Sequence, residues 1–415
     1  MFDVIRRIHR SSRWVRNAPF AGGAGAASRS IPARGVRISA MNPDTIIIGG
    51  GIIGCSIALR LAQSGLKVTL IERGALGREA SWAAAGMLTP QSETTGKEPL
   101  FEIGIRSRAL YRDFTDELRD ISGIDSEYRA EGTVCIALRD DDLHEFAVCS
   151  RAQNALGLRA ELVSAEEARR IEPSATPAAL GGLFLPDDHQ VENRKLMRSL
   201  AAALAKLDVG IVDNREVTQI AAEGNRAIGV SCSGELFTAG SVIVATGCWS
   251  SRLLSTVGMN LEVVPARGQM LAVKGGLTMS RVLHSSKVYV VPRLDGRILI
   301  GATVEYAGYS RQVTAAAMNS LMTAAIELAP AIADCEVTEM WCGFRPDTPD
   351  HCPIMGPAPL ENLFIATGHF RNGILLAPIT ADAIKEAVIN GAMPAYMDRF
   401  NWQRFESKQP MNKSS

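Results

Sequence analysis

The chain contains 415 residues, 47% of them hydrophobic and 21% charged, which is typical of a globular protein with one large domain or two interlocked domains. Its 44 basic residues match its 44 acidic residues in number, so the total charge indicates no polyanionic partner such as a nucleic acid. The apolar runs fall short of the ~18 residues that cross a membrane, so no membrane association is expected.

The first 40 residues differ from the rest in charge. They contain eight Arg, no Lys and a single Asp, which leaves 36 basic and 43 acidic residues in the remainder. The segment lacks the apolar stretch of a secretory signal, and three interpretations stay open: a miscalled start or dispensable extension before Met41, a mitochondrial targeting peptide, or a functional tail. In each case residues 1–43 are expected to lie outside the fold.

The eight cysteines are scattered without a CxxC pair or a repeated spacing. In a chain of this length, that distribution is typical of reduced thiols packed in a cytoplasmic protein. Cys342, His351 and Cys352 lie close together in sequence but fit no familiar zinc spacing, so no metal site is expected.

The predicted elements begin with a strand–helix–strand unit, in which apolar runs at 44–48 and 67–71 flank a helical stretch over 52–65. Further helices are predicted at 100–121, from the capping box at 164–167 to Pro173, and at 192–207, 313–328 and 374–389. Further strands are predicted at 133–138, 209–212, 227–231, 241–247 and 363–368, with a hairpin over 287–303. No repeat or linker separates these elements, so segments of two domains are expected to alternate along the chain.

The loop between the first strand and the first helix has the pattern Gly-x-Gly-x-x-Gly, with Gly49, Gly51 and Gly54. The first glycine allows a tight turn, the second lets the backbone approach a pyrophosphate, and the third lets the helix pack closely on the strand. The helix N-terminus then faces the phosphate charge. Glu72 ends the second strand, where a carboxylate can bind ribose hydroxyl groups. Together these features predict a dinucleotide site.

The segment after the second strand indicates which dinucleotide is bound. Residues 77–93, GREASWAAAGMLTPQSE, carry mostly small side chains, so their backbone can lie against a flat ring system. This favours a flavin over a nicotinamide, although a flexible Ala-rich loop would have the same composition.

Motifs over residues 44–395 resemble the FAD-dependent D-amino acid oxidase superfamily, and most closely the glycine oxidases of thiamine biosynthesis. The motifs, in chain order, are IIIGGGIIG, IER, REASWAAAGM, VIVATGCWS, VVPARGQM, YVVPR, GRILIGAT, GFRPDTPD and ATGHFRNGILLAP. The resemblance implies an α/β fold, in which a doubly wound, Rossmann-like FAD-binding domain is interleaved with a β-rich substrate-binding domain. The expected segments are 44–130, 188–262 and 341–395 for FAD, 131–187 and 263–340 for substrate, and 396–415 as a tail.

The resemblance also implies which residues bind FAD. Ile52 and Ile53 are expected at the pyrophosphate, Glu72 and Arg73 at the adenosine, and Val217 at the adenine. Two further groups are expected along the flavin ring: Ala80, Ser81, Ala85, Gly86 and Met87, and then His369, Phe370, Arg371, Asn372, Gly373, Ile374 and Leu375. A helix that begins near residue 372 can stabilise negative charge on the reduced flavin.

Substrate binding is expected to depend on a guanidinium group, because a planar guanidinium holds a carboxylate with two hydrogen bonds. Arg345 lies just after a strand-like run and matches the carboxylate-binding arginine of the resembled family. Tyr289 matches the tyrosine that donates to the same carboxylate, and Arg371 matches a position near substrate and flavin. The structural alternatives are that Arg345 forms an ion pair at the surface and that Tyr289 packs in the core.

The sequence departs from the resembled family at two expected pocket positions, where a His and a Met are replaced by Lys287 and Val304. These changes put the preference among glycine, sarcosine and small D-amino acids in doubt. Related sarcosine oxidases tether their flavin through a Cys in a comparable segment, and Cys342 is one residue out of that register. A covalent flavin is therefore an alternative to a non-covalent one.

The resemblance implies a cytoplasmic FAD-dependent oxidase of glycine or a related small amino acid, with O₂ as acceptor and a homotetrameric assembly. The alternatives are a D-amino acid dehydrogenase that reduces a quinone, and a catalytically idle FAD subunit that docks on a partner oxidase.

Overall fold

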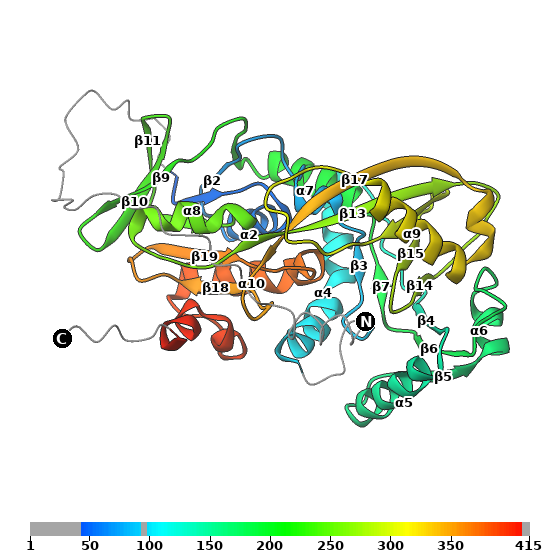
Figure 1. Ribbon diagram of the computed structural model, residues 1–415. Helices are drawn as coiled ribbons and strands as arrows, with labels where there is room; N and C mark the ends of the chain where they lie inside the picture. The colour runs from blue at the N-terminus through cyan, green and yellow to red at the C-terminus, as the bar shows by residue number, and fades with distance from the viewer. Residues whose placement is uncertain (1–42, 93–97, 409–415) are drawn as a thin grey trace, which may run out of the picture.

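The computed structural model describes residues 43–92 and 98–408. The molecule is elongated and is built around two large sheets (Figure 1). A six-stranded sheet lies at one end, and two long strands of an eight-stranded sheet run from the middle of the molecule to the other end.

The six-stranded sheet has the order β18-β19-β12-β1-β2-β8 and is parallel except for the edge strand β18. Its strands are β1 (Thr45–Ile48), β2 (Val68–Ile71), β8 (Gly210–Val212), β12 (Ser241–Val244), β18 (Ile354–Pro357) and β19 (Leu363–Thr367). Every residue of β1, β2 and β12 is buried. Short apolar runs such as TIII and SVIV form central strands because both faces of a parallel sheet are covered.

Helices cover one face of this sheet and a small sheet covers the other. The helical layer consists of α2 (Ile52–Gln63), α4 (Pro99–Ser122), α7 (Asn193–Lys206) and α10 (Gly373–Asn390), which share one core with β1 and β2. The opposite layer consists of the antiparallel strands β9 (Gln219–Glu223), β10 (Arg226–Cys232) and β11 (Glu235–Thr238), together with α8 (Ser250–Leu254). The strand order, which extends to both sides of β1, is that of the doubly wound, Rossmann-like fold expected from the sequence.

The eight-stranded sheet has the order β17-β13-β16-β15-β14-β4-β6-β5. Its strands are β4 (Thr133–Ala137), β5 (Glu161–Ser164), β6 (Gly181–Leu185), β13 (Val264–Lys274), β14 (Val282–His284), β15 (Tyr289–Pro292), β16 (Arg297–Gly301) and β17 (Glu336–Asp347). Helices α5 (Asp140–Ala155), α6 (Ala165–Ile171) and α9 (Ala315–Leu328) pack near this sheet.

Smaller elements complete the fold. Between the two large sheets lie α3 (Ala80–Ala83) and a two-stranded sheet of β3 (Met87–Leu88) and β7 (His189–Gln190). Five 3₁₀ segments are η1 (Gly247–Trp249), η2 (Ser255–Val257), η3 (Pro330–Asp334), η4 (Ala395–Phe400) and η5 (Trp402–Lys408).

Two of the expected segment boundaries do not fall between separate structural elements of the described chain. The boundary at 341 falls inside β17, which continues to Asp347 although it contains Pro346. The proline is tolerated because β17 is an edge strand, where a missing N–H group breaks no central ladder. The expected tail from 396 includes packed residues, since Met397 and Phe400 are buried and Trp402 and Phe405 pack against the core of the six-stranded sheet. Residues 1–42 and 409–415 lie outside the described part of the chain.

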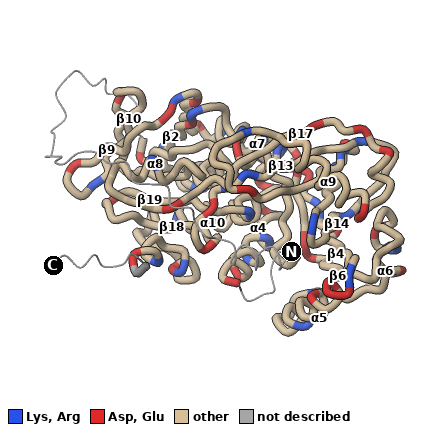
Figure 2. The backbone as a smooth tube through the Cα atoms, in the orientation of Figure 1, with Lys and Arg blue, Asp and Glu red and all other residues tan. Residues whose placement is uncertain are grey.

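Charged residues of both signs are interspersed along the backbone (Figure 2). Within residues 43–92 and 98–408, none of the helices combines the length and the hydrophobicity that crossing a membrane requires.

Candidate cofactor and substrate site

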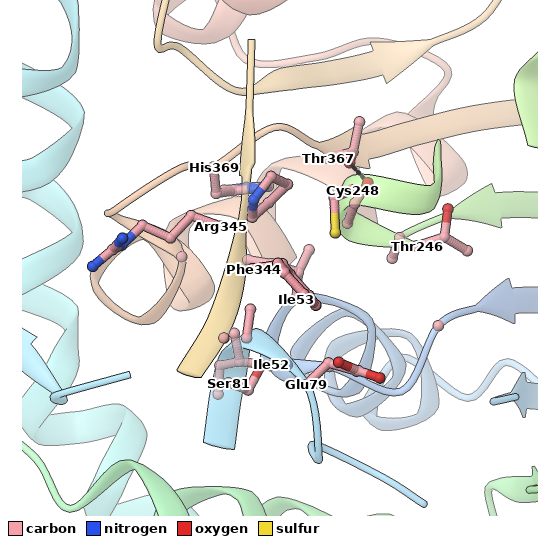
Figure 3. Close-up of a pocket in the computed structure, with 18 of the residues that line it drawn as sticks. Ile52, Ile53, Glu79, Ser81, Thr246, Cys248, Phe344, Arg345, Thr367 and His369 are labelled. Atoms are coloured by element: carbon pink, nitrogen blue, oxygen red, sulfur yellow. Dashed lines mark hydrogen bonds between the residues drawn. The ribbon is translucent and has the colours of Figure 1, made fainter. Parts of the chain in front are cut away.

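A large cavity of about 240 Å³ lies where the carboxyl ends of the parallel strands meet the eight-stranded sheet (Figure 3). Its wall combines the β1–α2 loop, α3 and the segment after it, the β8–β9 and β12–α8 loops, β17, and the start of α10. The carboxyl edge of an open parallel sheet is the usual ligand site of such folds.

The glycine loop has the backbone geometry that its sequence predicts. Gly49 has φ of +105°, and a Cβ atom there would lie 2.4 Å from the carbonyl oxygen of Ala245, which directly follows β12. A Cβ atom on Gly54 would lie 1.9 Å from the carbonyl oxygen of Gly49, so α2 packs on the loop without room for a side chain. The N-terminus of α2 therefore faces the cavity, where Gly51, Ile52 and Ile53 line the wall.

The first turn of α2 supplies N–H groups that have no acceptor within their own helix. One of these N–H groups has an acceptor outside the helix, because the Ile52 N–H donates to Ser81 Oγ at 2.9 Å. The carboxylate of Glu72 accepts from Gly50 N at 2.7 Å and from Gly74 N at 2.9 Å, which holds it against the loop and at the cavity wall. A carboxylate has further lone pairs for hydroxyl donors, so Glu72 is placed to bind a ribose.

An aromatic and charged cluster lies at the adenosine end expected from the sequence. The Arg73 guanidinium lies 3.5 Å above the ring of Trp249 and pairs with Glu79 at 2.7 Å. Trp249 stacks in turn on Tyr309 with ring centroids 5.5 Å apart. Val217 lines the same cavity from the loop between β8 and β9.

The start of α10 forms another part of the wall. Residues 369–374 line the cavity, and Asn372 is the N-cap of α10, so the helix dipole is directed at this wall. Phe370 adopts φ of +45°. His369 is 2% exposed, and burial lowers its pKa to about 3, so the imidazole is neutral near neutral pH. Its Nε2 atom lies 3.1 Å from Thr380 Oγ1.

The three residues expected to bind substrate line this same cavity. Arg345 and Tyr289 reach it from β17 and β15, and Arg371 reaches it from the loop before α10. Arg345 Nη1 donates to the carbonyl oxygen of Thr303 at 2.9 Å, and the Tyr289 hydroxyl group lies 3.8 Å from Met270 Sδ. The expectation that Arg345 follows its strand was wrong, since it lies within β17 opposite Ala266 of β13.

A buried polar network supports the segment that Arg345 contacts. Thr303 Oγ1 donates to Glu305 Oε1 at 2.6 Å, and Gln269 Nε2 donates to the same oxygen at 2.7 Å. Arg267 forms an ion pair with Glu305, and their backbones exchange two hydrogen bonds. These contacts fix the position of the Thr303 carbonyl group and so limit the movement of Arg345.

Most of the expected site residues meet in the cavity, but four positions do not line it. They are Gly54, Leu375, Lys287 and Val304. Gly54 contacts the loop behind the wall, and Leu375 is buried in the helical core. Lys287 pairs with Glu327 at 2.8 Å, with about half of each side chain exposed. The two departures from the resembled family therefore lie away from the cavity.

Sequence reasoning missed several residues of the wall. They include Glu79, Thr246, Cys248, Trp249, Gly268, Met270 and Phe344. Most of these residues lie within the motifs VIVATGCWS, VVPARGQM and GFRPDTPD. Their membership of these motifs could have indicated that they belong to the site. Cys342 is adjacent to the wall but does not line it, because its Sγ atom lies 3.2 Å from the carbonyl oxygen of Arg311. The described residues contain no cluster of His, Cys, Asp and Glu that could hold a metal ion.

The wall fits FAD at three places. N–H groups at the start of α2, which have no acceptor within the helix, suit a pyrophosphate. The small-residue segment 83–87 leaves space for a flat ring, and the N-terminus of α10 favours negative charge on that ring. The glycine loop, Glu72 and Val217, and the segment 83–87 all line this one cavity, as a dinucleotide site requires.

Comparison with known proteins supports this assignment. Residues 44–387 match the family described as FAD dependent oxidoreductase. Glycine oxidase of Bacillus licheniformis is 33% identical over 367 residues, which cover 88% of this chain and 98% of that protein. The crystal structure of glycine oxidase from Geobacillus kaustophilus has a TM-score of 0.83 at 32% identity, covering 87% of this chain and 98% of that chain.

A second group of relatives is longer than this chain. The bifunctional protein ThiO/ThiG of Trichormus variabilis is 35% identical over 382 residues, which cover 89% of this chain. The match spans 56% of that relative, so the chain covers about half the length of these bifunctional proteins. The chain belongs to the family of FAD dependent oxidoreductases, as the resemblance of its motifs predicted, and its cofactor is FAD.

Proposed function

We propose that the protein oxidises glycine or a related small amino acid at the α-carbon, as an FAD-dependent oxidase. The observation that carries this proposal is that Arg345 and Tyr289 line the same cavity as the glycine loop. This shared cavity supports a carboxylate clamp beside the dinucleotide site. Bound FAD supplies the hydride acceptor and passes the two electrons to O₂, which becomes H₂O₂.

The residues of the chain bind and orient the substrate. In this proposal the Arg345 guanidinium holds the carboxylate through two charge-assisted hydrogen bonds, and the Tyr289 hydroxyl group donates to the same group. Arg371 adds a further positive charge to the wall. The substrate amine enters as the neutral base, so the α-carbon loses a hydride and leaves an iminium group. Loss of an N–H proton to water gives the imine, and this proton and the hydride together supply the two electrons and two protons that turn O₂ into H₂O₂.

The products follow from the fate of the imine. Hydrolysis of a glycine imine gives glyoxylate and ammonia, with water as the co-reactant. Relatives named ThiO/ThiG and glycine oxidase support a second route, in which the imine enters thiazole formation for thiamine. A cytoplasmic homotetramer remains part of this proposal. So does the division into segments 44–130, 188–262 and 341–395 for FAD and 131–187 and 263–340 for substrate, with β17 crossing the boundary at 341.

The test uses the purified full-length protein. We expect a yellow protein that releases FAD and forms H₂O₂ with glycine, sarcosine or a small D-amino acid, with O₂ consumed in equal amount. Reduction of a quinone analogue without O₂ consumption would favour a D-amino acid dehydrogenase instead. Bound FAD that no amino acid reduces under anaerobic conditions would favour a non-catalytic FAD subunit.

A further inference from the structure

A buried arginine lies behind the wall of the cavity. Arg293 follows β15 and is 6% exposed. Its guanidinium donates to three uncharged oxygens: Ala85 O at 2.5 Å, Gln190 Oε1 at 3.2 Å and Asn193 Oδ1 at 3.2 Å. The Nε atom has no hydrogen-bond partner among the described residues. Arg293 is therefore a buried cation whose hydrogen bonds go to neutral groups.

Burial of this charge is costly, and burial lowers the pKa of Arg293 to about 10. Glu192 is the carboxylate with the strongest influence on it, followed by the positive charge of Arg297. Glu192 is engaged elsewhere, since Oε2 accepts from Lys195 N at 2.5 Å and Oε1 lies 3.5 Å from Arg297 Nη2. The positive charge of Arg293 is thus only partly compensated on the side away from the cavity.

The segment that Arg293 contacts has an unusual backbone. Gly86 has φ of +69°, and its carbonyl oxygen accepts from Val191 N at 2.8 Å. The preceding carbonyl group, of Ala85, points to Arg293. A Cβ atom on residue 86 would lie 2.0 Å from the carbonyl oxygen of Val191, so this path is open only to glycine.

This path fixes the direction of two N–H groups. The C=O and N–H groups of a trans peptide point in opposite directions. The N–H group of Gly86 therefore points away from Arg293, and that of Met87 away from Val191. Both residues line the cavity. Asn193 holds the other end of the segment, because its Nδ2 atom donates to Ser81 O at 2.8 Å.

We propose that Arg293 is a positioning residue that makes this wall electropositive. It holds the Ala85 carbonyl group, so that the Gly86 N–H group is directed at the ring of FAD. Its buried charge also favours the extra negative charge that the ring carries when reduced, because charges act over longer distances in a low-dielectric interior. This inference rests on the proposed placement of the flavin ring against residues 85–87.

The test is the midpoint potential of bound FAD, measured by equilibration with a reference dye. Arg293→Gln keeps an N–H donor for the Ala85 carbonyl group but removes the charge. At a fixed potential, we expect the ratio of reduced to oxidised FAD in this variant to fall at least tenfold. This corresponds to a midpoint potential that is about 30 mV lower, because the couple transfers two electrons. Arg293→Lys keeps the charge and is expected to retain most of the wild-type potential. Lys287→Met removes an exposed charge just before β15 and is the control, with no shift expected.

Each outcome decides the proposal. An Arg293→Gln protein that binds FAD with the wild-type potential would overturn it, as would a shift of equal size in Lys287→Met. Arg293→Gln could purify without FAD. In that case the proposal is supported if Arg293→Lys retains FAD and has the wild-type midpoint potential. Loss of FAD from both variants would mean that Arg293 only packs the wall. Failure of the wild-type protein to bind FAD would instead overturn the proposed site itself.

Discussion

The guanidinium group of Arg345 lies against the backbone of Gly268 in the neighbouring strand. A Cβ atom on residue 268 would come within 2.4 Å of Arg345 Nη1 and within 2.6 Å of its Cζ. The contact is with the end of a flexible side chain and not with backbone, so an alanine there would displace the guanidinium group while the strand pairing is kept. Gly268 is therefore part of the geometry that presents Arg345 to the cavity.

We predict that Gly268→Ala raises the KM for glycine about tenfold or more, because the displaced guanidinium group no longer meets the carboxylate. The visible spectrum and the FAD content should stay close to those of the wild type. Gly276→Ala is the matched control, since a Cβ atom there meets nothing within 4 Å. Equal KM values for the two variants would show that the contact between residues 268 and 345 has no role in substrate binding.

A second prediction concerns the link between protein and FAD. Cys342 does not line the cavity, so we expect acid precipitation to release all FAD into the supernatant, and Cys342→Ser to behave in the same way. The Cys248 thiol does line the cavity, and burial raises its pKa to about 12, so it stays protonated and unreactive. A yellow pellet after precipitation would contradict this prediction, and a yellow pellet from the serine variant would implicate Cys248.

A third prediction concerns pH and the ion pair beside Arg371. His351 Nδ1 lies 2.8 Å from Asp347 Oδ1, and the ring of His351 stacks on that of Phe370 at 5.1 Å. The hydrogen bond to Asp347 raises the pKa of His351 above its usual value of 6.5, with Asp350 adding to the rise and Arg371 opposing it. A raised pKa in the folded state means that protonated His351 stabilises the fold below about pH 6.5. This contribution is lost as the pH rises through the folded-state pKa.

Thermal unfolding of His351→Asn tests this prediction, since Asn tolerates the φ of +58° at this position. The difference in Tm between wild type and variant should be larger at about pH 5.5 than at about pH 9. Solvent screening limits its size, because the His351 side chain is 36% exposed. His144→Asn, at an exposed position of α5, is the control and should show no such trend. A constant difference for His351→Asn across this range would contradict the assigned ion pair.

Local sequence was sufficient for the part of the site that is built from neighbouring residues. The Gly49–Gly54 loop, α2 and β2 form one continuous unit, so their spacing predicts both the turn and the close packing. The helices and strands predicted from periodicity were found close to their expected bounds, as for α7 and α10. Charged or polar segments without clear periodicity, such as α5, were not predicted.

The substrate side of the cavity depends on contacts between distant segments, which spacing cannot reveal. Arg345 pairs across strands with Ala266 and contacts Thr303, and Arg293 contacts Ala85 from more than 200 residues away. The same limitation explains Lys287, which aligns with a pocket position of related enzymes but points to Glu327 on α9. Only the pairing of β13, β15, β16 and β17 decides which side chains of these strands face the cavity.

The most direct test of the account is the activity of Arg345 variants toward glycine. If the guanidinium group holds the substrate carboxylate, Arg345→Met leaves that charge unpaired at a cost of about 3–5 kcal/mol. The expected result is a fall in kcat/KM of roughly 10²–10³-fold or more. Partial recovery is expected in Arg345→Lys, because an ammonium group cannot form the two parallel hydrogen bonds. Lys287→Ala, at a surface position, should match the wild type. A value for Arg345→Met within threefold of the wild type, with FAD bound, would contradict the account and move the carboxylate site to Arg371.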